Sequence, residues 1–522
     1  MNSQQPQKKV EPMKNKSQVF LTKQPLSQQV TDFLLIRIER GDYNPHDKLP
    51  SVRTLAQQLG VHRLTVFKSY QQLVHNGKIY AKDRSGYYVM PSIEVEKKNS
   101  NLEHNLASVN DQPYDGTRSM QQLISPAILA SMNFKPPIVS SPLRTNMLSE
   151  LQAHEVDYQF SKALIDPALL PNAYMSEYVK RVFDLYPKLL GTYSTVQGDE
   201  ELRGSLAEYF KKRHHFFLLP EDILITSGAQ QAIDLIARLM IKPGDTVIME
   251  RPTYSAAIDI FRQQGAHIIT IPMLPDGYDM DELESIIRNY KPRMMYVNPT
   301  FHNPTGYVLP ASKRKRLVEL AEEYHFLITE DDTTYDMYFE EEPPQPIYGY
   351  DTEGVVMYIR SFSKYIAPGL RIAAVLCSPW LMKDLLTLKS LADGGSPLLG
   401  QKIFMHYFTS SRMQTHMEKL RIALSLRKEA MERCLTKTNW EWTPPKGGLD
   451  LWIQLPEGVS SMELLRRSLA LSVSFVPGPF CDPDAVHHSS SIRLSYCYTS
   501  ERQIEEGMQR LLHAYDSLVR MT

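Results

Sequence analysis

Five segments between residues 223 and 364 share one pattern, a short apolar run followed at once by a turn with polar residues. Apolar runs that alternate with helical stretches predict a mostly parallel α/β sheet. Because ligands bind beyond the carboxyl ends of parallel strands, we expect the polar turns to build one pocket. The segments are ILITSGAQQAIDLIARLM (223–240), TVIMERPTY (246–254), MMYVNPTFHNPTG (294–306), FLITEDDTTY (326–335) and VVMYIRSFSK (355–364).

The chain has 522 residues, far more than a single hydrophobic core organises. With 42% hydrophobic and 22% charged residues, it is globular and not wholly disordered. We divide it into a polar tail (1–19), a compact module (20–90), a polar linker without periodicity (91–125) and a large α/β module (126–522).

The net charge of −1 hides an uneven distribution. Residues 1–90 hold 14 Lys and Arg against 6 Asp and Glu, a net charge of +8. The remaining residues hold 44 Lys and Arg against 53 Asp and Glu, a net charge of −9. This asymmetry predicts two partners of different charge, with a polyanion for the basic head.

The basic module has the pattern of three helices followed by a hairpin. Ser51 is a natural N-cap for the second helix, and Gly60 supplies the tight turn before the third, which together predict a helix-turn-helix. The first turn of the third helix is expected to face the major groove, where Arg63 can contact guanine. A wing is expected from strands at 79–82 and 87–89. The residues predicted to contact DNA are Ser51, Arg53, His62, Arg63, Thr65, Ser85 and Gly86.

The sequence of this module resembles the winged-helix domain of the GntR family. It reads LPSVRTLAQQLGVHRLTVFKSYQQL…SGYYV, and the family pattern is LPSxRxLAxxLGVxRxTVxxxYxxL…GSGxFV. Arg84 stands where that family has its first wing glycine. A single Arg on a helix is usually a solvated charge, but the full pattern together with the charge of +8 favours double-stranded DNA as the partner.

The polar turns of the large module carry complementary chemistry. Gly228 opens a helix whose first N–H groups suit a phosphate. Lys364 could form a Schiff base with an aldehyde, and Asp331 could hold a pyridinium nitrogen. Asn303 could donate to a ring oxygen, and Tyr254 could stack over the ring. Any one of these residues alone is weak evidence for a cofactor site, but together they predict a pyridoxal 5'-phosphate site.

Residues 150–522 resemble the fold-type I aminotransferases of the aspartate aminotransferase superfamily, through SGAQQAIDL, NPTG and SFSKxxxPGLR. The resemblance implies a large, mostly parallel α/β domain and a smaller α+β domain. It implies that Lys364 is the catalytic Schiff-base lysine and that Arg493 clamps a carboxylate. It also implies that Tyr193 reaches the phosphate in a neighbouring subunit. The implied cofactor-binding residues are Gly228, Ala229, Gln230, Tyr254, Asn303, Asp331, Tyr335, Ser361, Ser363, Lys364, Arg371 and Tyr193.

Some positions depart from that family. Thr334 stands where a ring-contacting Tyr is usual, with Tyr335 next to it. Ala163, Ala256 and Ala373 replace frequent glycines. These departures affect substrate turnover more than cofactor binding, and we expect weak or no transaminase activity.

A winged helix joined to an aminotransferase-like module resembles the MocR/GabR subfamily of GntR regulators. This resemblance implies a transcriptional regulator that dimerises head to tail and senses an amino compound or pyridoxal phosphate. The alternatives are a class I/II aminotransferase that carries a DNA-binding head, and a DNA-binding protein whose aminotransferase-like scaffold holds no cofactor.

From further sequence features we expect the protein in the cytoplasm. The N-terminus lacks the apolar core of a secretory signal, and no apolar run is long enough for a membrane span. The four cysteines are scattered and are predicted to be reduced thiols: Cys377, Cys434, Cys481 and Cys497. Two histidine pairs, His214-His215 and His487-His488, are not expected to bind a metal.

Overall fold

The structure is a computed structural model, and it describes residues 26–82, 86–90 and 144–520. The chain divides into two compact units, Met1–Asp111 and Gln112–Thr522. The predicted tail and linker lie outside the described residues, and so do Arg84 and Ser85 of the predicted wing turn.

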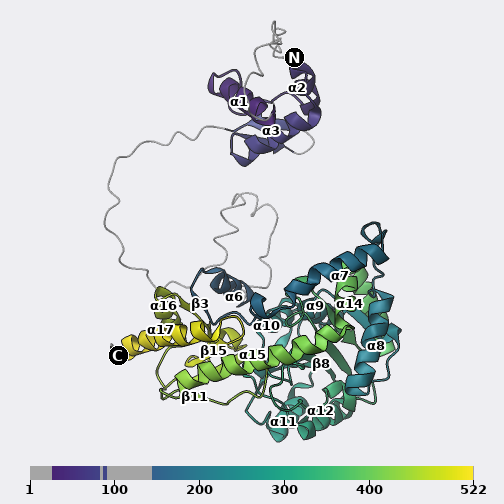
Figure 1. Cartoon of the computed structure of the whole chain (residues 1–522), viewed down its shortest axis with the longest axis vertical. Helices are drawn as coiled ribbons and strands as arrows, with labels where there is room; N and C mark the ends of the chain where they lie inside the picture. Colours follow the sequence, from purple (N-terminus) through teal and green to yellow (C-terminus); the bar gives the residue numbers. More distant parts are fainter. Residues whose placement is uncertain (1–25, 83–85, 91–143, 521–522) are drawn as a thin grey trace, which may run out of the picture. The chain divides into compact units, whose positions relative to one another are not determined.

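In the first unit, three helices enclose an apolar core and an antiparallel hairpin follows them (Figure 1). The elements are α1 (Leu26–Glu39), α2 (Val52–Leu59), α3 (Arg63–His75), β1 (Ile79–Lys82) and β2 (Gly86–Val89). Ser51 caps α2, because its Oγ accepts the N–H of Thr54 at 3.1 Å. Gly60 has a φ of 67°, which a residue without a Cβ adopts readily. The predicted helix-turn-helix is therefore confirmed.

The second unit is built on a seven-stranded sheet with the order β4-β10-β9-β8-β7-β5-β6. Only β10 runs antiparallel to its neighbours, so the predicted mostly parallel sheet is confirmed. The strands are β4 (Ile223–Thr226), β5 (Thr246–Arg251), β6 (His267–Pro272), β7 (Met294–Val297), β8 (Leu327–Asp332), β9 (Val356–Ser361) and β10 (Ala373–Leu376).

Helices cover both faces of this sheet (Figure 1). Along β5, Val247 and Met249 pack with α9 (Ala229–Met240), α10 (Ser255–Gln263) and α13 (Pro379–Ala392). The residue between them, Ile248, packs instead with α11 (Met280–Tyr290) and α12 (Ala311–Tyr324). Side chains of a strand alternate between its two faces, so Val247, Ile248 and Met249 are apolar in succession because both faces of β5 are covered.

A smaller antiparallel sheet has the order β11-β12-β15-β14. Its strands are β11 (Glu441–Trp442), β12 (Asp450–Gln454), β14 (Val476–Pro477) and β15 (Ser491–Ser495), while β3 (Tyr158–Gln159) pairs in parallel with β13 (Val473–Ser474). The remaining helices are α6 (Arg144–Ala153), α7 (Asn172–Leu185), α8 (Glu200–His214), α14 (Leu398–Phe408), α15 (Ser411–Leu435), α16 (Ser461–Ala470) and α17 (Glu501–Val519), with short 3-10 turns at 167–169, 189–191, 220–222, 347–350, 368–370 and 478–481.

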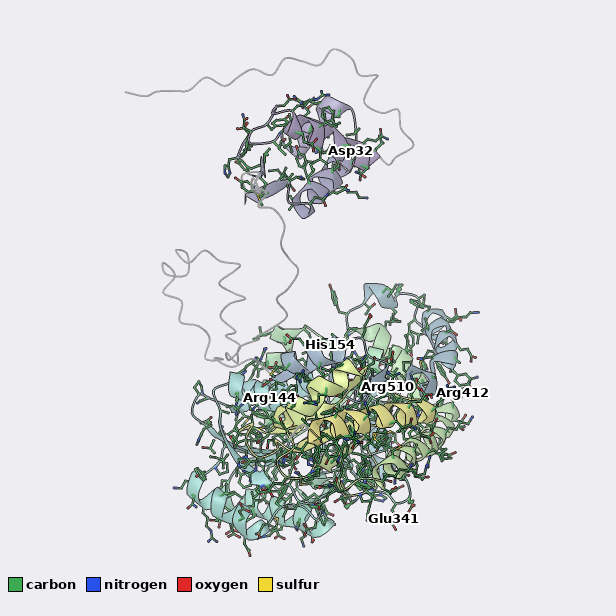
Figure 2. The ribbon with its side chains drawn as sticks, turned by 90° about the vertical axis from the view of Figure 1, so that its left-hand side faces the viewer. Asp32, Arg144, His154, Glu341, Arg412 and Arg510 are labelled. Atoms are coloured by element: carbon green, nitrogen blue, oxygen red, sulfur yellow. The ribbon has the colours of Figure 1, made fainter. Side chains whose placement is uncertain are left out.

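The long helix α15 packs beside α17 and joins distant parts of the unit (Figure 1). Arg412, at its start, pairs with Glu177 of α7 at 2.7 Å (Figure 2). Farther along, the buried Arg427 donates to the backbone oxygen of Cys497, just beyond β15. The second contact ties α15 to the end of β15, the strand that carries Arg493. None of the helices in the described ranges is long and apolar enough to cross a membrane.

Candidate functional site

The predicted cofactor residues lie at one edge of the seven-stranded sheet. Asp331 is near the end of β8, and Lys364 follows β9 by three residues. The loop after β4 passes through Gly228 into α9. Because β4, β8 and β9 run in the same direction, their carboxyl ends meet at this edge.

Electrostatic interactions show which of these side chains lie near one another. The positive charge of Lys364 acts to lower the pKa of Asp331. Burial and the negative charge of Asp331 together raise the pKa of Tyr254 to about 12, and Arg493 and Arg371 oppose the rise. The charges of Asp331, Lys364, Arg371 and Arg493 thus act on one another or on Tyr254 at this edge of the sheet.

Asp331 is 3% exposed, and its two carboxylate oxygens differ. The hydroxyl of Tyr296 donates to Oδ2 at 2.7 Å. Oδ1 is buried and has no hydrogen-bond partner among the described residues. Burial raises the pKa of Asp331 to about 6, and the Tyr296 hydrogen bond limits the rise. An unpartnered buried carboxylate oxygen fits a ligand that brings its own N–H, as a pyridinium ring does.

The loop at the start of α9 forms a cradle suited to an anion. No side chain caps α9 at its N-terminus. The N–H groups of its first turn can therefore donate to an anion. Arg371 donates to the backbone oxygen of Ser227 at 3.1 Å and lies against Gly228. A Cβ at Gly228 would sit 2.6 Å from Nη2 of Arg371, and φ is 87° there, so the cradle requires glycine.

The other predicted members of the cradle differ in how they are placed. Ser361 and Ser363 are both buried, and the Ser363 hydroxyl donates to the backbone oxygen of Ile372 at 3.2 Å. Ala229 is the first residue of α9, and the side chain of Gln230 is exposed. The backbone N–H of Gln230 belongs to the first turn of α9, which faces the cradle.

Arg493 lies on β15 and is 3% exposed. Its Nη1 donates to Oδ1 of Asn303 at 3.1 Å, and its Nη2 donates to the backbone oxygen of Ser161 at 2.8 Å. Each terminal nitrogen has a second hydrogen, so a carboxylate can still be held at two points. Asp450 lies 3.5 Å from Nε and balances the buried charge.

The structure does not support the predicted role of Tyr335 at the cofactor. Its hydroxyl donates to the backbone oxygen of Pro343 at 3.2 Å, and its ring packs edge-on against His214 at 4.7 Å between centroids. The neighbouring Thr334 is also turned aside, because its hydroxyl donates to the backbone oxygen of Thr300. Tyr193, predicted to serve a neighbouring subunit, is 96% exposed.

Three important residues were missed by the sequence analysis. Tyr296 orients the carboxylate of Asp331, and Asn298 contacts both Asp331 and Asn303. Gln231 accepts the N–H of Ser227 at 2.7 Å and shapes the loop before α9. Gln231 is adjacent in sequence to a predicted residue, whereas Tyr296 lies in the buried strand β7 and Asn298 directly follows it. A polar side chain at such a position is the sequence feature that could have indicated these three residues.

The predicted DNA face lies on α2, α3 and the hairpin. Arg53, His62 and Arg63 are exposed, and Thr65 is half-buried. Gly86, at the start of β2, is exposed as well. Phe67 on α3 is 44% exposed, which is unusual for a side chain of its size. Ser51 serves mainly as the cap of α2, while Ser85 lies outside the described residues.

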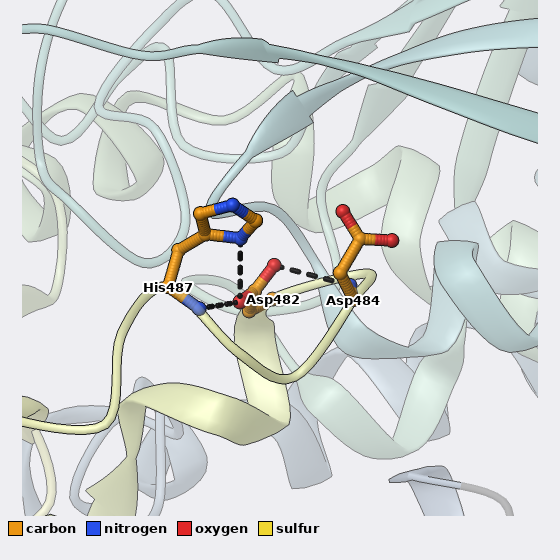
Figure 3. Close-up of side chains that lie close together, drawn as sticks. All are labelled: Asp482, Asp484 and His487. Carbon is orange, nitrogen blue, oxygen red and sulfur yellow. Dashed lines mark hydrogen bonds and ion pairs between the residues drawn. The ribbon is translucent and has the colours of Figure 1, made fainter.

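One group of metal-ligand type, Asp482, Asp484 and His487, lies in the loop before β15 (Figure 3). The carboxylate of Asp482 accepts the backbone N–H groups of Asp484, Val486 and His487 at 2.7–3.1 Å. These bonds account for the closeness of the three residues as a turn, without a metal ion.

Comparison with known families assigns both units. The model for aminotransferases of class I and II matches residues 183–511, and the model for bacterial regulatory proteins of the gntR family matches residues 26–89. The chain belongs to the aminotransferase class I and II family and carries a GntR helix-turn-helix head. This combination is the MocR/GabR-type architecture, and use of pyridoxal phosphate is general to the aminotransferase family.

Individual relatives match either the second unit or nearly the whole chain. Aromatic-amino-acid aminotransferase 1 of Thermococcus litoralis is 34% identical over 66% of this chain and 84% of its own. The uncharacterized HTH-type transcriptional regulator YdfD of Bacillus subtilis is 29% identical over 94% of this chain and 96% of its own. The structure of LysN, an alpha-aminoadipate aminotransferase from Thermus thermophilus complexed with N-(5'-phosphopyridoxyl)-L-leucine, has a TM-score of 0.69, 31% identity, and coverage of 75% of this chain and 100% of its own.

Proposed function

We propose that this protein is a cytoplasmic, DNA-binding transcriptional regulator whose aminotransferase-like unit binds pyridoxal phosphate and senses an amino compound or the cofactor itself. One observation carries the proposal. A single chain combines an exposed basic recognition helix with a buried carboxylate, a lysine and an anion cradle that meet at one sheet edge. The near full-length match to a protein named as a transcriptional regulator supports it.

The residues present fit pyridoxal phosphate. Oδ1 of Asp331 would accept the pyridine N–H, and Lys364 would supply the amine that bonds to the aldehyde. Gly228, Ala229, Ser361, Ser363 and Arg371 would hold the phosphate, with Asn303 at the ring oxygen and Tyr254 over the ring. When bound, the cofactor supplies a reactive aldehyde and an electron-withdrawing ring.

The effector would enter between the two sheets. An amino compound would compete with Lys364, and Arg493 would hold its carboxylate through the two remaining N–H groups. Because Arg493 lies on the smaller sheet and Lys364 follows the larger one, occupancy would shift one part of the unit against the other. The linker would pass that shift to the winged helices and change their spacing on DNA.

The exposed Tyr193 supports a homodimer. Tyr193 is 96% exposed and Leu190, three residues earlier, is 76% exposed, although both are large and apolar. A second copy of the chain, arranged head to tail, would cover them and place Tyr193 at the partner's phosphate. Sedimentation of the full chain tests this, and a monomer at micromolar concentration would contradict it.

Two measurements test the proposed function. Purified protein with pyridoxal phosphate should show a visible absorption band that borohydride removes, and a colourless protein would contradict the proposal. Recovery of genomic DNA bound to the full chain should yield a defined operator, and its neighbouring genes would indicate the effector.

An active aminotransferase is the second candidate, because the cofactor residues are intact and relatives of the second unit are named as aminotransferases. Amino-group transfer to a 2-oxo acid distinguishes the two. Turnover in the usual enzyme range of ~1–10³ per second would favour the enzyme. We expect weak or no turnover.

A further inference from the structure

A single buried amide joins the two residues assigned to the cofactor ring. Asn298 follows β7 directly and is 3% exposed. Its Oδ1 accepts the backbone N–H of Asn303 at 2.6 Å, and its Nδ2 donates to the backbone oxygen of Asp331. An N–H can only donate and a carbonyl can only accept, so the two partners also determine which way the amide points.

A buried carboxylate holds Asn298 from behind. Glu250, on β5, is fully buried, and its Oε2 accepts the backbone N–H of Asn298 at 2.8 Å. The hydroxyl of Tyr278 donates to its other oxygen at 2.8 Å, and Nε2 of His302 lies 3.1 Å from Oε2. Three strands of the sheet, β5, β7 and β8, are thus connected through Glu250, Asn298 and Asp331.

The same connection reaches the carboxylate clamp. Asn303, whose backbone is held by Asn298, accepts a hydrogen bond from Arg493 through its side chain at 3.1 Å. The backbone of Asp331 is held by Asn298 and its carboxylate by Tyr296. Loss of the amide would leave one buried donor and one buried acceptor without partners, and would free the two ring contacts to move relative to each other.

We propose that Asn298 is a positioning residue, backed by Glu250, that sets the distance between Asp331 and Asn303 and so adjusts the site to the cofactor ring. The inference rests on the proposed binding of pyridoxal phosphate. Asn298 itself needs no contact with the cofactor. Its amide both donates and accepts, so neither Ala nor Asp can replace it.

The test is titration of the full-length chain with pyridoxal phosphate, followed by tryptophan fluorescence and by the visible band. Asn298→Ala should weaken binding by about 10- to 100-fold, which is the usual effect of losing two buried hydrogen bonds. Asn172→Ala is the matched control. Nδ2 of Asn172 also donates to a backbone oxygen, that of Pro167 at 3.0 Å, but Asn172 is exposed. That control should bind as the unmodified chain does.

Asn298→Asp separates positioning from general stability. The aspartate has nearly the same shape and keeps an acceptor for Asn303, but it cannot donate to the Asp331 carbonyl and adds a negative charge beside it. Binding should weaken by about 10-fold or more, and the visible band of the bound cofactor should titrate at a higher pH. Far-UV circular dichroism verifies folding, and this variant also carries the test if Asn298→Ala does not fold.

The outcomes are distinguishable. If the unmodified chain does not bind pyridoxal phosphate, the proposed function is wrong. If the unmodified chain binds it and a folded Asn298→Ala or Asn298→Asp binds within about twofold with an unchanged pH titration, the positioning role is wrong.

Discussion

The hydroxyl of Tyr296 donates a 2.7 Å hydrogen bond to Oδ2 of Asp331, while Oδ1 of the same carboxylate is buried with no partner in the described part of the chain. One oxygen thus orients the group and the other remains available. The proposed cofactor site depends on this difference, because an ionised carboxylate stabilises the protonated form of a pyridine nitrogen.

Tyr296→Phe should make cofactor binding more sensitive to acid. Burial already raises the pKa of Asp331 to about 6, and the Tyr296 hydrogen bond opposes that rise, so its loss raises the pKa further. Binding of pyridoxal phosphate should fall as the pH drops through this pKa, with a midpoint about one pH unit higher in the variant. Tyr358→Phe, which removes a 2.8 Å bond to Asp332, is the control. Equal midpoints for Tyr296→Phe and the unmodified chain would contradict the assignment.

Asp331→Asn should abolish cofactor binding and stabilise the cofactor-free protein at neutral pH. A carboxyl group whose pKa is about 6 when folded and 3.8 in its ordinary state destabilises the fold as pH rises through that interval. The stability of the variant relative to the unmodified chain should grow by about 2 kcal/mol between pH 4 and 7. Urea unfolding measures it, with the exposed Asp276→Asn as control. A constant difference would show that Asp331 is not destabilised by burial.

His214→Phe should remove part of the acid sensitivity of the second unit. Burial and the charge of Arg360 lower the pKa of His214 to about 3 in the folded chain, against 6.5 for an ordinary histidine. Below pH 6.5 the unfolded chain therefore binds a proton at this residue that the folded chain does not bind. The unmodified chain should therefore lose about 2 kcal/mol between pH 7 and pH 5 that the variant retains.

The matched control for this variant is the adjacent exposed residue, His215→Asn, because Asn tolerates the φ of 58° found there. The charge of His215 is the least of the named contributions to the lowered pKa of His214, so this variant should keep most of the acid sensitivity of the unmodified chain. If His214→Phe loses stability with acid as steeply as the unmodified chain does, the assignment of His214 as a buried, uncharged histidine is wrong.

Arg63→Ala and Arg53→Ala should affect DNA binding in different ways. Loss of a base contact by Arg63 should weaken operator binding by about 1–3 kcal/mol and relax sequence preference. Loss of a phosphate contact by Arg53 should weaken binding to all sequences and reduce the salt slope by about one. Arg37→Ala is the control, because Arg37 already pairs with Asp42 at 2.8 Å. Equal effects of the first two variants on operator and random DNA would contradict these roles.

Much of the site could be predicted because parallel strands bring their carboxyl ends to one edge. Asp331, Lys364 and Gly228 are far apart in sequence, but each follows or ends an apolar run, so their meeting was expected. The contacts of Asn298 were not predictable, because they join backbone groups whose approach depends on the packing of β5, β7 and β8. The contacts of Tyr335 with Pro343 and His214 could not be predicted, because no local pattern reveals that packing.

The most direct test of the account compares the unmodified chain and Lys364→Ala on the operator recovered from genomic DNA. Footprinting is done without addition, with pyridoxal phosphate, and with pyridoxal phosphate plus each of a panel of amino acids. The account predicts that the length or strength of the footprint changes for the unmodified chain and stays constant for Lys364→Ala, which still binds the operator. Identical responses of the two proteins, or no response from either, would contradict regulation through this site.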